Sequence, residues 1–264
     1  MKNKTYPTDM TDSQWNHIKE LVPKEEKRGR PRELEMRKVI NAIFYVVHGG
    51  IQWRMLPKEY PNWSSVYYYF RKWTKNKAWK QIHDMLRARI RQKEGRHKHP
   101  TAGSIDSQSV KGSLVPGVRG YDAGKKVKGR KRHLLVDTLG LVLAAAVTPA
   151  NVQDRDGARQ LLKRLPGSCK CLRKIWVDGA YRGKLLDWVA EKFKFHLEVV
   201  AKLSDQCGFQ VLPRRWVVER TFGWLNCQRR LSKDYERLTE TSEVFIYISM
   251  TRLMVNRLAR DANI

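Results

Sequence analysis

Acidic side chains are scarce in this sequence: 26 Asp and Glu stand against 53 Lys and Arg, which gives the 264 residues a formal net charge of +27. A charge of this size is far beyond what solubility requires. It indicates a polyanionic partner; the phosphate backbone of nucleic acid is the obvious one and a membrane surface the weaker alternative. The shortage of acids also makes every carboxylate placed among cations, or inside a strand, a candidate for function.

Three further absences narrow the class of protein. No run of about 18 apolar residues exists and the opening MKNKTYPTDM has no apolar signal core, so we expect a cytoplasmic protein without a membrane partner. No Gly-x-x-x-x-Gly-Lys-Ser/Thr loop exists, so ATP-driven chemistry is not indicated. The few cysteines lack the spacing of zinc modules and are expected to be reduced thiols: Cys169, Cys171, Cys207 and Cys227.

The first 95 residues predict an all-helical domain. A capping box over Thr11–Gln14 opens the first helix, and Ser64 is expected to cap the third. The third helix is basic and aromatic, which favours a helix-turn-helix-like DNA-binding domain over a plain helical bundle with a solvated basic face. After the first helix, the expected helices span about 33–48, 65–73 and 78–92. The polar run that ends near Pro100 marks a boundary, so we predict domains over 1–95 and 102–264.

From Ala102 onward, alternation of apolar and polar residues replaces the helical period. Strands and helices then follow one another in the order typical of an α/β domain with a mixed, five-stranded sheet flanked by helices. The expected strands span about 104–110, 133–136, 141–147, 172–177 and 197–200, and the expected helices about 154–165, 184–194, 213–233 and 243–260.

A basic stretch over 119–132 is expected to be a flexible loop that contacts DNA phosphates. It holds seven cations against the single acid Asp122, and its glycines allow a partner to approach the backbone closely. The alternative is a solvated charged loop. The cations are Arg119, Lys125, Lys126, Lys128, Arg130, Lys131 and Arg132.

Three acids occupy places where acids are unusual. Asp106 lies within the first strand of the sheet, Asp178 follows the fourth strand, and Glu219 is the lone acid of the helix expected over 213–233. If the first and fourth strands are neighbours, the three carboxylates converge and would require a neutralising cation. Two Mg²⁺ or Mn²⁺ ions are the expected cofactors, since they activate a water or a 3′-hydroxyl and stabilise the leaving oxygen of a phosphodiester. The alternative role for Glu219 is an i, i+4 ion pair with Arg215.

Four separated motifs closely resemble insertion-sequence transposases of the IS5 group, within the broader IS4-like DDE transposases. They are SIDSQSVK around Asp106, GRKRHLLVDTLGL over 129–141, VDGAYRG around Asp178, and RRWVVERTFGWL around Glu219. The N-terminal MTDSQWNHIKELVP is similar to the helical DNA-binding segment of that group, so the resemblance covers nearly the whole chain.

The resemblance implies an RNase H-like fold and a catalytic, metal-binding triad of Asp106, Asp178 and Glu219. It implies cleavage at the ends of an insertion sequence and transfer of the ends into target DNA, by a homodimer or larger assembly on double-stranded DNA in the bacterial nucleoid. In the wider family's Tyr-x₂-Arg-x₃-Glu-x₆-Lys pattern, Arg215 and Glu219 match, whereas Leu212 and Asn226 replace the Tyr and the Lys. Arg229 or Arg230 could then make the phosphate contact of the missing lysine.

The remaining polar candidates are interpreted as structural. Asp137 is expected in a hairpin turn, where a short acid bonds the local backbone, and His133 at the start of a strand. The other candidates are Asp154 and Asp156 at a helix start, and Trp216 and Trp224, for which core packing outweighs stacking on an extruded base. The rival function is a catalytically silent DNA-binding protein derived from a transposase. The intact acid triad argues against it.

Overall fold

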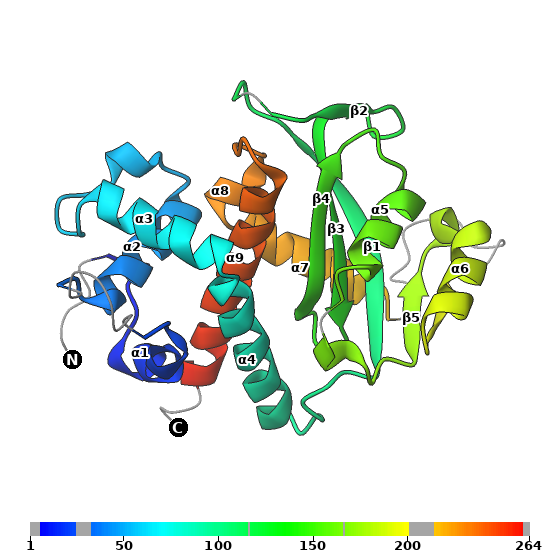
Figure 1. Ribbon diagram of the computed structural model, residues 1–264, viewed down its shortest axis with the longest axis horizontal. Helices are drawn as coiled ribbons and strands as arrows, with labels where there is room; N and C mark the ends of the chain where they lie inside the picture. Colours follow the sequence, from blue (N-terminus) through cyan, green and yellow to red (C-terminus); the bar gives the residue numbers. More distant parts are fainter. Residues whose placement is uncertain (1–5, 25–32, 116, 166, 201–213, 261–264) are drawn as a thin grey trace. The chain divides into compact units, whose positions relative to one another are not determined.

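The computed structural model describes residues 6–24, 33–115, 117–165, 167–200 and 214–260, and the chain forms two compact units (Figure 1). The first unit combines Met1–Gly95 with Cys227–Ser232 and Val244–Ile264. The second unit combines Arg96–Asn226 with Lys233–Glu243. Within the described residues, no helix is both long enough and apolar enough to cross a membrane.

The first unit is helical, and the four helices predicted for the N-terminal residues are present. The capping box is confirmed, because the Thr11 side chain accepts from Gln14 N and the Gln14 side chain accepts from Thr11 N. The predicted cap of the third helix is wrong: Asn62, not Ser64, accepts the capping hydrogen bond, from Ser64 N. The helices are α1 (Asp12–Ile18), α2 (Met36–Gly49), α3 (Trp63–Lys75), α4 (Ala78–Lys93), α8 (Arg229–Ser232) and most of α9 (Thr239–Arg260).

Aromatic rings connect the N-terminal helices of the first unit to its C-terminal helix. Phe70 of α3 stacks on Phe245 of α9 with ring centroids 5.1 Å apart, and Trp53 lies 4.9 Å from Phe70. Phe70 and Phe245 are fully buried. The C-terminal helix therefore completes the core of the first unit, whereas the sequence placed it in the second domain.

One mixed sheet of six strands, counted over the described residues, forms the second unit (Figure 1). β1 lies between β3, to which it is antiparallel, and β5, to which it is parallel. The five predicted strands are all present, and the short β2 is the sixth. The strands are β1 (Ala102–Lys111), β2 (Gly120–Asp122), β3 (Val127–Asp137), β4 (Val142–Pro149), β5 (Lys174–Val177) and β6 (His196–Val199).

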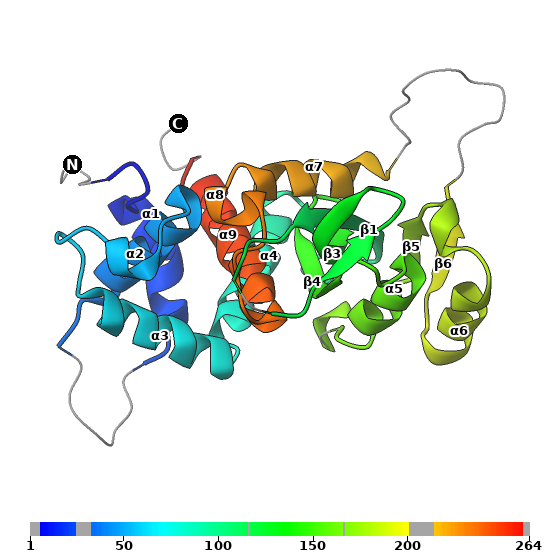
Figure 2. The same ribbon diagram turned by 90° about the horizontal axis from the view of Figure 1, so that it is seen from above.

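Helices cover both faces of this sheet. Figure 2 shows α7 (Trp216–Asn226) on one side of β1 and β3 and α5 (Asp154–Leu162) on the other. Beneath α5, buried apolar side chains from the strands form the core with those of α6 (Lys184–Lys192); Ile105, Leu135, Ile175, Leu161 and Leu185 are among them. Burial of this area is the main stabilising contribution to the unit.

The predicted flexible loop over 119–132 is wrong in most of its length. Residues 120–122 form β2 and residues 127–132 form the first half of β3, leaving only a tight turn between them. Lys126 in this turn has a positive φ of 53°. The density of cations obscures the strand in the sequence. These cations can be buried in β3 because acids from other segments of the chain pair with them.

The single helix predicted over 213–233 is two helices. α7 ends at Asn226 and α8 begins at Arg229, so Arg229 and Arg230 do not continue the face that carries Glu219. Pro213, the first residue of the predicted helix, lies outside the described residues.

A glycine in α5 allows this helix to lie directly on β3. A Cβ at Gly157 would overlap the imidazole ring of His133. Gly157→Ala is therefore expected to lower the free energy of unfolding by about 1–3 kcal/mol, although alanine normally favours a helix. Urea unfolding measures it. Gly223→Ala is the matched control, since Gly223 lies in α7 with no atom near the added methyl; an equal loss in both variants would contradict the overlap.

Candidate active site

Two of the predicted acids lie side by side on neighbouring parallel strands. β1 and β5 pair up to Ser104 and Trp176, and two further residues along each strand lead to Asp106 and Asp178. Since side chains alternate along a strand, both project on the same face of the sheet. The condition that the first and fourth of the expected strands be neighbours is therefore met.

Backbone amides orient both carboxylates. Asp106 Oδ1 accepts from Ser107 N at 2.7 Å. Asp178 Oδ1 accepts from Ala180 N at 2.9 Å, which makes Asp178 the cap of the short helical turn Gly179–Tyr181. The other oxygen of each carboxylate, Oδ2, is directed toward Arg215.

Arg215 is the cation that faces both acids. Its Nη2 lies 3.7 Å from Asp106 Oδ2 and 3.6 Å from Asp178 Oδ2, and its side chain is 9% exposed. These separations are longer than hydrogen bonds, so the guanidinium acts as a counter-charge across a gap. The alternative pairing of Arg215 with Glu219 is not found among the ion pairs of the described residues.

Burial raises the pKa of Asp106 to about 6. The Ser107 amide and the Arg215 guanidinium lower this pKa, whereas the neighbouring Asp178 carboxylate raises it. Ionisation of the Asp106 carboxyl therefore lowers the stability of the folded state. Such a cost is often found at sites where a charge is needed for chemistry.

Glu219 reaches the same region from α7, which packs on β1 and β3. It lines a shallow hollow of about 400 Å³ together with Ser107, the residue after Asp106, and Lys125. In the portion of the chain that the structure describes, no three acidic, histidine or cysteine side chains are grouped closely enough to hold a metal ion. Asp106 and Asp178 thus form a pair, and Glu219 lines the neighbouring hollow, next to Ser107.

The predicted DNA-contacting cations of the β2–β3 segment separate into two groups. Lys125, Lys126 and Lys128 are exposed around the turn. Lys125 Nζ also donates to Ser107 O at 3.2 Å, so this turn borders the hollow below Glu219.

The second group, Arg130, Lys131 and Arg132, is at most 6% exposed and therefore unavailable to a phosphate in this conformation. Arg130 pairs with Asp234 at 3.0 Å. Lys131 Nζ lies 3.2 Å from Asp122 and 3.0 Å from Asp154. Burial lowers the pKa of Arg132 to about 10 against the opposing charge of Asp234. Sequence reasoning missed this group because Asp154 and Asp234, two of its acidic partners, lie outside the basic stretch.

A buried polar network supports the strand that carries Asp106, and sequence reasoning missed it too. Ser107 Oγ donates to Asp154 Oδ1 at 2.8 Å, and Ser109 Oγ donates to Asp122 Oδ2 at 2.6 Å. Lys131 joins the two acids, so β1, β3 and the start of α5 are held together next to the site. The serines at alternate positions of SIDSQS were the available signal.

The remaining predicted cations lie in the first unit. Arg229 is exposed at the start of α8, and Arg230 Nη1 donates to Ile51 O at 2.9 Å, with its guanidinium 5.5 Å from the ring of Phe245. Arg230 therefore contributes to packing within that unit.

Two tryptophans of α7 lie on either side of the Arg220 side chain. The guanidinium of Arg220 lies 4.4 Å from the ring of Trp216 and 4.6 Å from that of Trp224. Arg220 also donates to Leu139 O at 3.0 Å, which ties α7 to the β3–β4 turn. Trp216 remains 40% exposed, so the expected core packing of this residue is incomplete.

His133 and Asp137 have structural roles, as expected. Asp137 Oδ1 accepts from the amides of Leu139 and Leu141 and shapes the β3–β4 turn. His133 is fully buried, with Nε2 2.9 Å from Thr148 Oγ1, and burial lowers its pKa to about 4.

This lowered pKa predicts a loss of stability in mild acid. Between pH 6.5 and 4 the unfolded chain binds a proton at residue 133 that the folded chain excludes, so stability falls as the pH falls. The free energy of unfolding of the wild type should drop by up to about 1.4 kcal/mol per pH unit more steeply than that of His133→Gln. Urea titrations across this range test it, with the exposed His97→Gln as control. Parallel curves for wild type and His133→Gln would contradict the prediction.

Comparisons with known proteins give matches to both the N-terminal and the C-terminal part of the chain. A family model described as "Transposase DDE domain" matches residues 97–254, and one described as "Putative transposase of IS4/5 family" matches residues 10–83. A similar protein from Burkholderia cepacia, the "Putative transposase for insertion sequence element IS402", is 31% identical over 144 residues. The match covers 50% of this chain and 65% of that protein, just under two thirds of its length.

Proposed function

Since the chain belongs to the IS4/IS5 group of DDE transposases, we propose that it binds the ends of an insertion sequence, cleaves phosphodiester bonds there with divalent metal, and transfers the freed 3′-hydroxyl ends to target DNA. The observation that carries this proposal is the pair of carboxylates, Asp106 and Asp178, on adjacent parallel strands and facing one cation. The family also implies an RNase H-like arrangement, with which the mixed sheet around β1 is consistent.

The residues fit a divalent metal. Asp106 and Asp178 offer hard oxygen donors, and each turns Oδ2 toward a positive charge already. We propose that these two hold Mg²⁺ or Mn²⁺ and that Glu219 completes the set. When bound, such ions polarise the phosphodiester and activate its nucleophile.

The other groups around the acids then have defined roles. The Ser107 and Ala180 amides orient the two aspartates. Arg215, no longer required as their counter-charge, becomes available to a DNA phosphate. The exposed Lys125, Lys126 and Lys128 at the border of the hollow would hold the phosphate backbone.

For the first unit we propose DNA binding through a helix-turn-helix-like arrangement. On α3, Val66, Phe70 and Trp73 are buried, while Tyr67 and Tyr68 are 38% and 57% exposed. The helix thus presents an aromatic and basic outer face on a packed inner one, as a recognition helix does. Because two element ends must be joined, we propose that the chain acts on DNA as a homodimer or larger assembly.

Metal removal tests the proposed activity. The purified chain should cleave a duplex that carries the terminal inverted repeats flanking its coding sequence when Mg²⁺ or Mn²⁺ is added, and cleavage should fall to background with EDTA. Gel analysis of end-labelled DNA measures it. DNA binding without cleavage under any divalent metal would favour the rival function, a catalytically silent DNA-binding protein.

A further inference from the structure

A second hollow lies at the opposite end of the parallel strands from the acids. Its volume is about 550 Å³, within the range of small-molecule sites. Leu172 precedes β5 and Asp178 follows it, so the hollow lies roughly 15–20 Å along the strand from the paired carboxylates. It is therefore a separate site.

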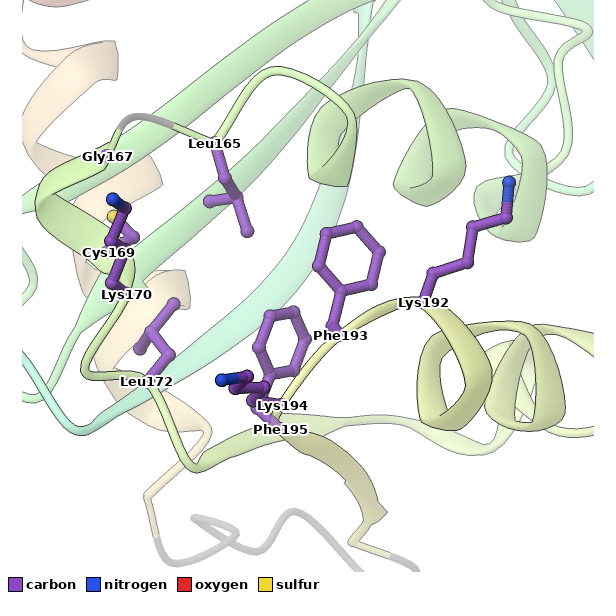
Figure 3. A pocket seen from close by; sticks show the side chains of 9 residues that line it. All are labelled: Leu165, Gly167, Cys169, Lys170, Leu172, Lys192, Phe193, Lys194 and Phe195. Atoms are coloured by element: carbon purple, nitrogen blue, oxygen red, sulfur yellow. The ribbon is translucent and has the colours of Figure 1, made fainter.

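The hollow is a slot between two apolar walls. Figure 3 shows Leu165 and Leu172 on one side and Phe193 and Phe195 on the other. The two phenylalanine rings lie 5.0 Å apart at an interplanar angle of 28°. Leu172 and Phe195 are buried, whereas Leu165 and Phe193 are half-buried. The phenylalanine wall offers an aromatic surface against which a flat ring can pack.

Three lysines line this slot, and among its lining residues that the structure describes there is no acid. Lys170, Lys192 and Lys194 are all exposed. Lys192 also lies 5.6 Å from the ring of Trp188, which in turn contacts Phe193 edge to face. The charge around an apolar slot is thus wholly positive, which selects a ligand with a planar apolar part and anionic flanks.

We propose that this slot binds one unpaired nucleotide of DNA, with the base between the two walls and its flanking phosphates on the lysines. The inference deepens the proposed function and rests on it, since it gives the same protein a second DNA contact. Aromatic side chains combined with cations are the recurrent means of binding unpaired nucleic acid without reading its sequence, and here Phe193 and Phe195 supply the aromatic wall. The four wall residues, as far as the structure describes this region, carry no hydrogen-bonding side chain, so we expect little preference among the four bases.

Fluorescence of 2-aminopurine tests the proposal. The probe is placed opposite an abasic site in one duplex and opposite thymine in a second, and binding is measured with EDTA present at one fixed salt concentration. Wild-type protein should change the fluorescence of the unpaired probe and bind that duplex about tenfold more tightly than the paired one, the effect expected of one stacked base.

Two variants, each with a matched control, identify the site. Phe193→Leu keeps the apolar packing but removes the ring, and should abolish the preference for the unpaired duplex, while Phe193→Tyr should retain it. Lys170→Gln with Lys194→Gln should weaken binding of the unpaired duplex more than Lys163→Gln with Lys184→Gln, a control pair of exposed lysines that do not line the slot. Thermal melting confirms that each variant is folded.

The outcomes separate the slot from the proposed activity. A preference that persists in Phe193→Leu overturns the inference, and so does a wild type that binds both duplexes equally. A third outcome would assign the slot to a protein partner instead. In that case the protein shows no preference for the unpaired duplex, and it binds an acidic peptide that carries a phenylalanine preferentially and through Phe193. Since EDTA prevents cleavage throughout, failure of the metal-dependent cleavage leaves these measurements unaffected.

Discussion

Asp106→Asn is expected to lower the rate of metal-dependent DNA cleavage by about 10³-fold or more while DNA affinity stays unchanged. The substitution removes one of the two carboxylates that turn toward Arg215, and an amide is a poor ligand for Mg²⁺ beside a charged acid. The cations proposed to hold DNA are untouched, so binding and cleavage should separate in this variant.

Stability provides a second measurement on the same variant. Because the folded-state pKa of Asp106 is raised to about 6, its ionised form at pH 7 costs folding free energy that a neutral Asn does not. Asp106→Asn should therefore melt at the same temperature as the wild type or higher, which excludes misfolding as the cause of lost cleavage. Asp187→Asn, an exposed acid of α6, is the control for both measurements. Cleavage by Asp106→Asn at the wild-type rate would refute the assignment.

Asp234→Ala is expected to lower the free energy of unfolding by about 3–5 kcal/mol. The side chains of Asp234 and Arg130 are each 2% exposed, and their ion pair is 3.0 Å long. Asp234 also accepts from Ser242 Oγ at 2.8 Å and from Glu236 N at 3.0 Å. Removing the acid leaves a buried guanidinium without its counter-charge inside the central sheet.

Denaturant unfolding of three variants measures this effect. Asp234→Leu combined with Arg130→Met should recover much of the stability lost in Asp234→Ala, since the pair is replaced by apolar groups of similar volume. Glu198→Gln breaks the Lys174–Glu198 pair, whose side chains are 34% and 41% exposed, and should cost at most about 1 kcal/mol. If Asp234→Ala costs no more than Glu198→Gln, the buried pair does not stabilise the sheet.

The sequence predicted much of the second unit because its strands and acids follow local rules. Alternating apolar positions indicated β1, and Asp178-Gly179 directly after a short apolar run placed the second acid at the end of β5. The adjacency of these two strands was not predicted but assumed, and the structure meets that assumption. The helices of the first unit followed equally from apolar periodicity and capping residues.

What the sequence could not predict depends on partners far along the chain. Arg130 and Lys131 were assigned to a flexible loop that contacts DNA phosphates, since nothing nearby reveals that Asp234, 104 residues away, neutralises Arg130 inside the sheet. The break between α7 and α8 falls at Cys227 and Gln228, where no proline or glycine signals a helix end. The return of α9 to the first unit is a property of tertiary packing, for which apolar periodicity holds no information.

The first unit is built from segments that are distant along the chain, so its core can be completed only late in synthesis. The chain passes four times between the two units, and Phe245 reaches the ribosomal peptidyl-transferase centre 175 residues after Phe70, the ring on which it stacks. At about 5–20 residues per second, the N-terminal helices wait roughly 10–35 s for that partner. Throughout this interval the nascent chain exposes the aromatic surface that the finished protein buries, so protection by chaperones during synthesis should determine how much folded protein a cell obtains.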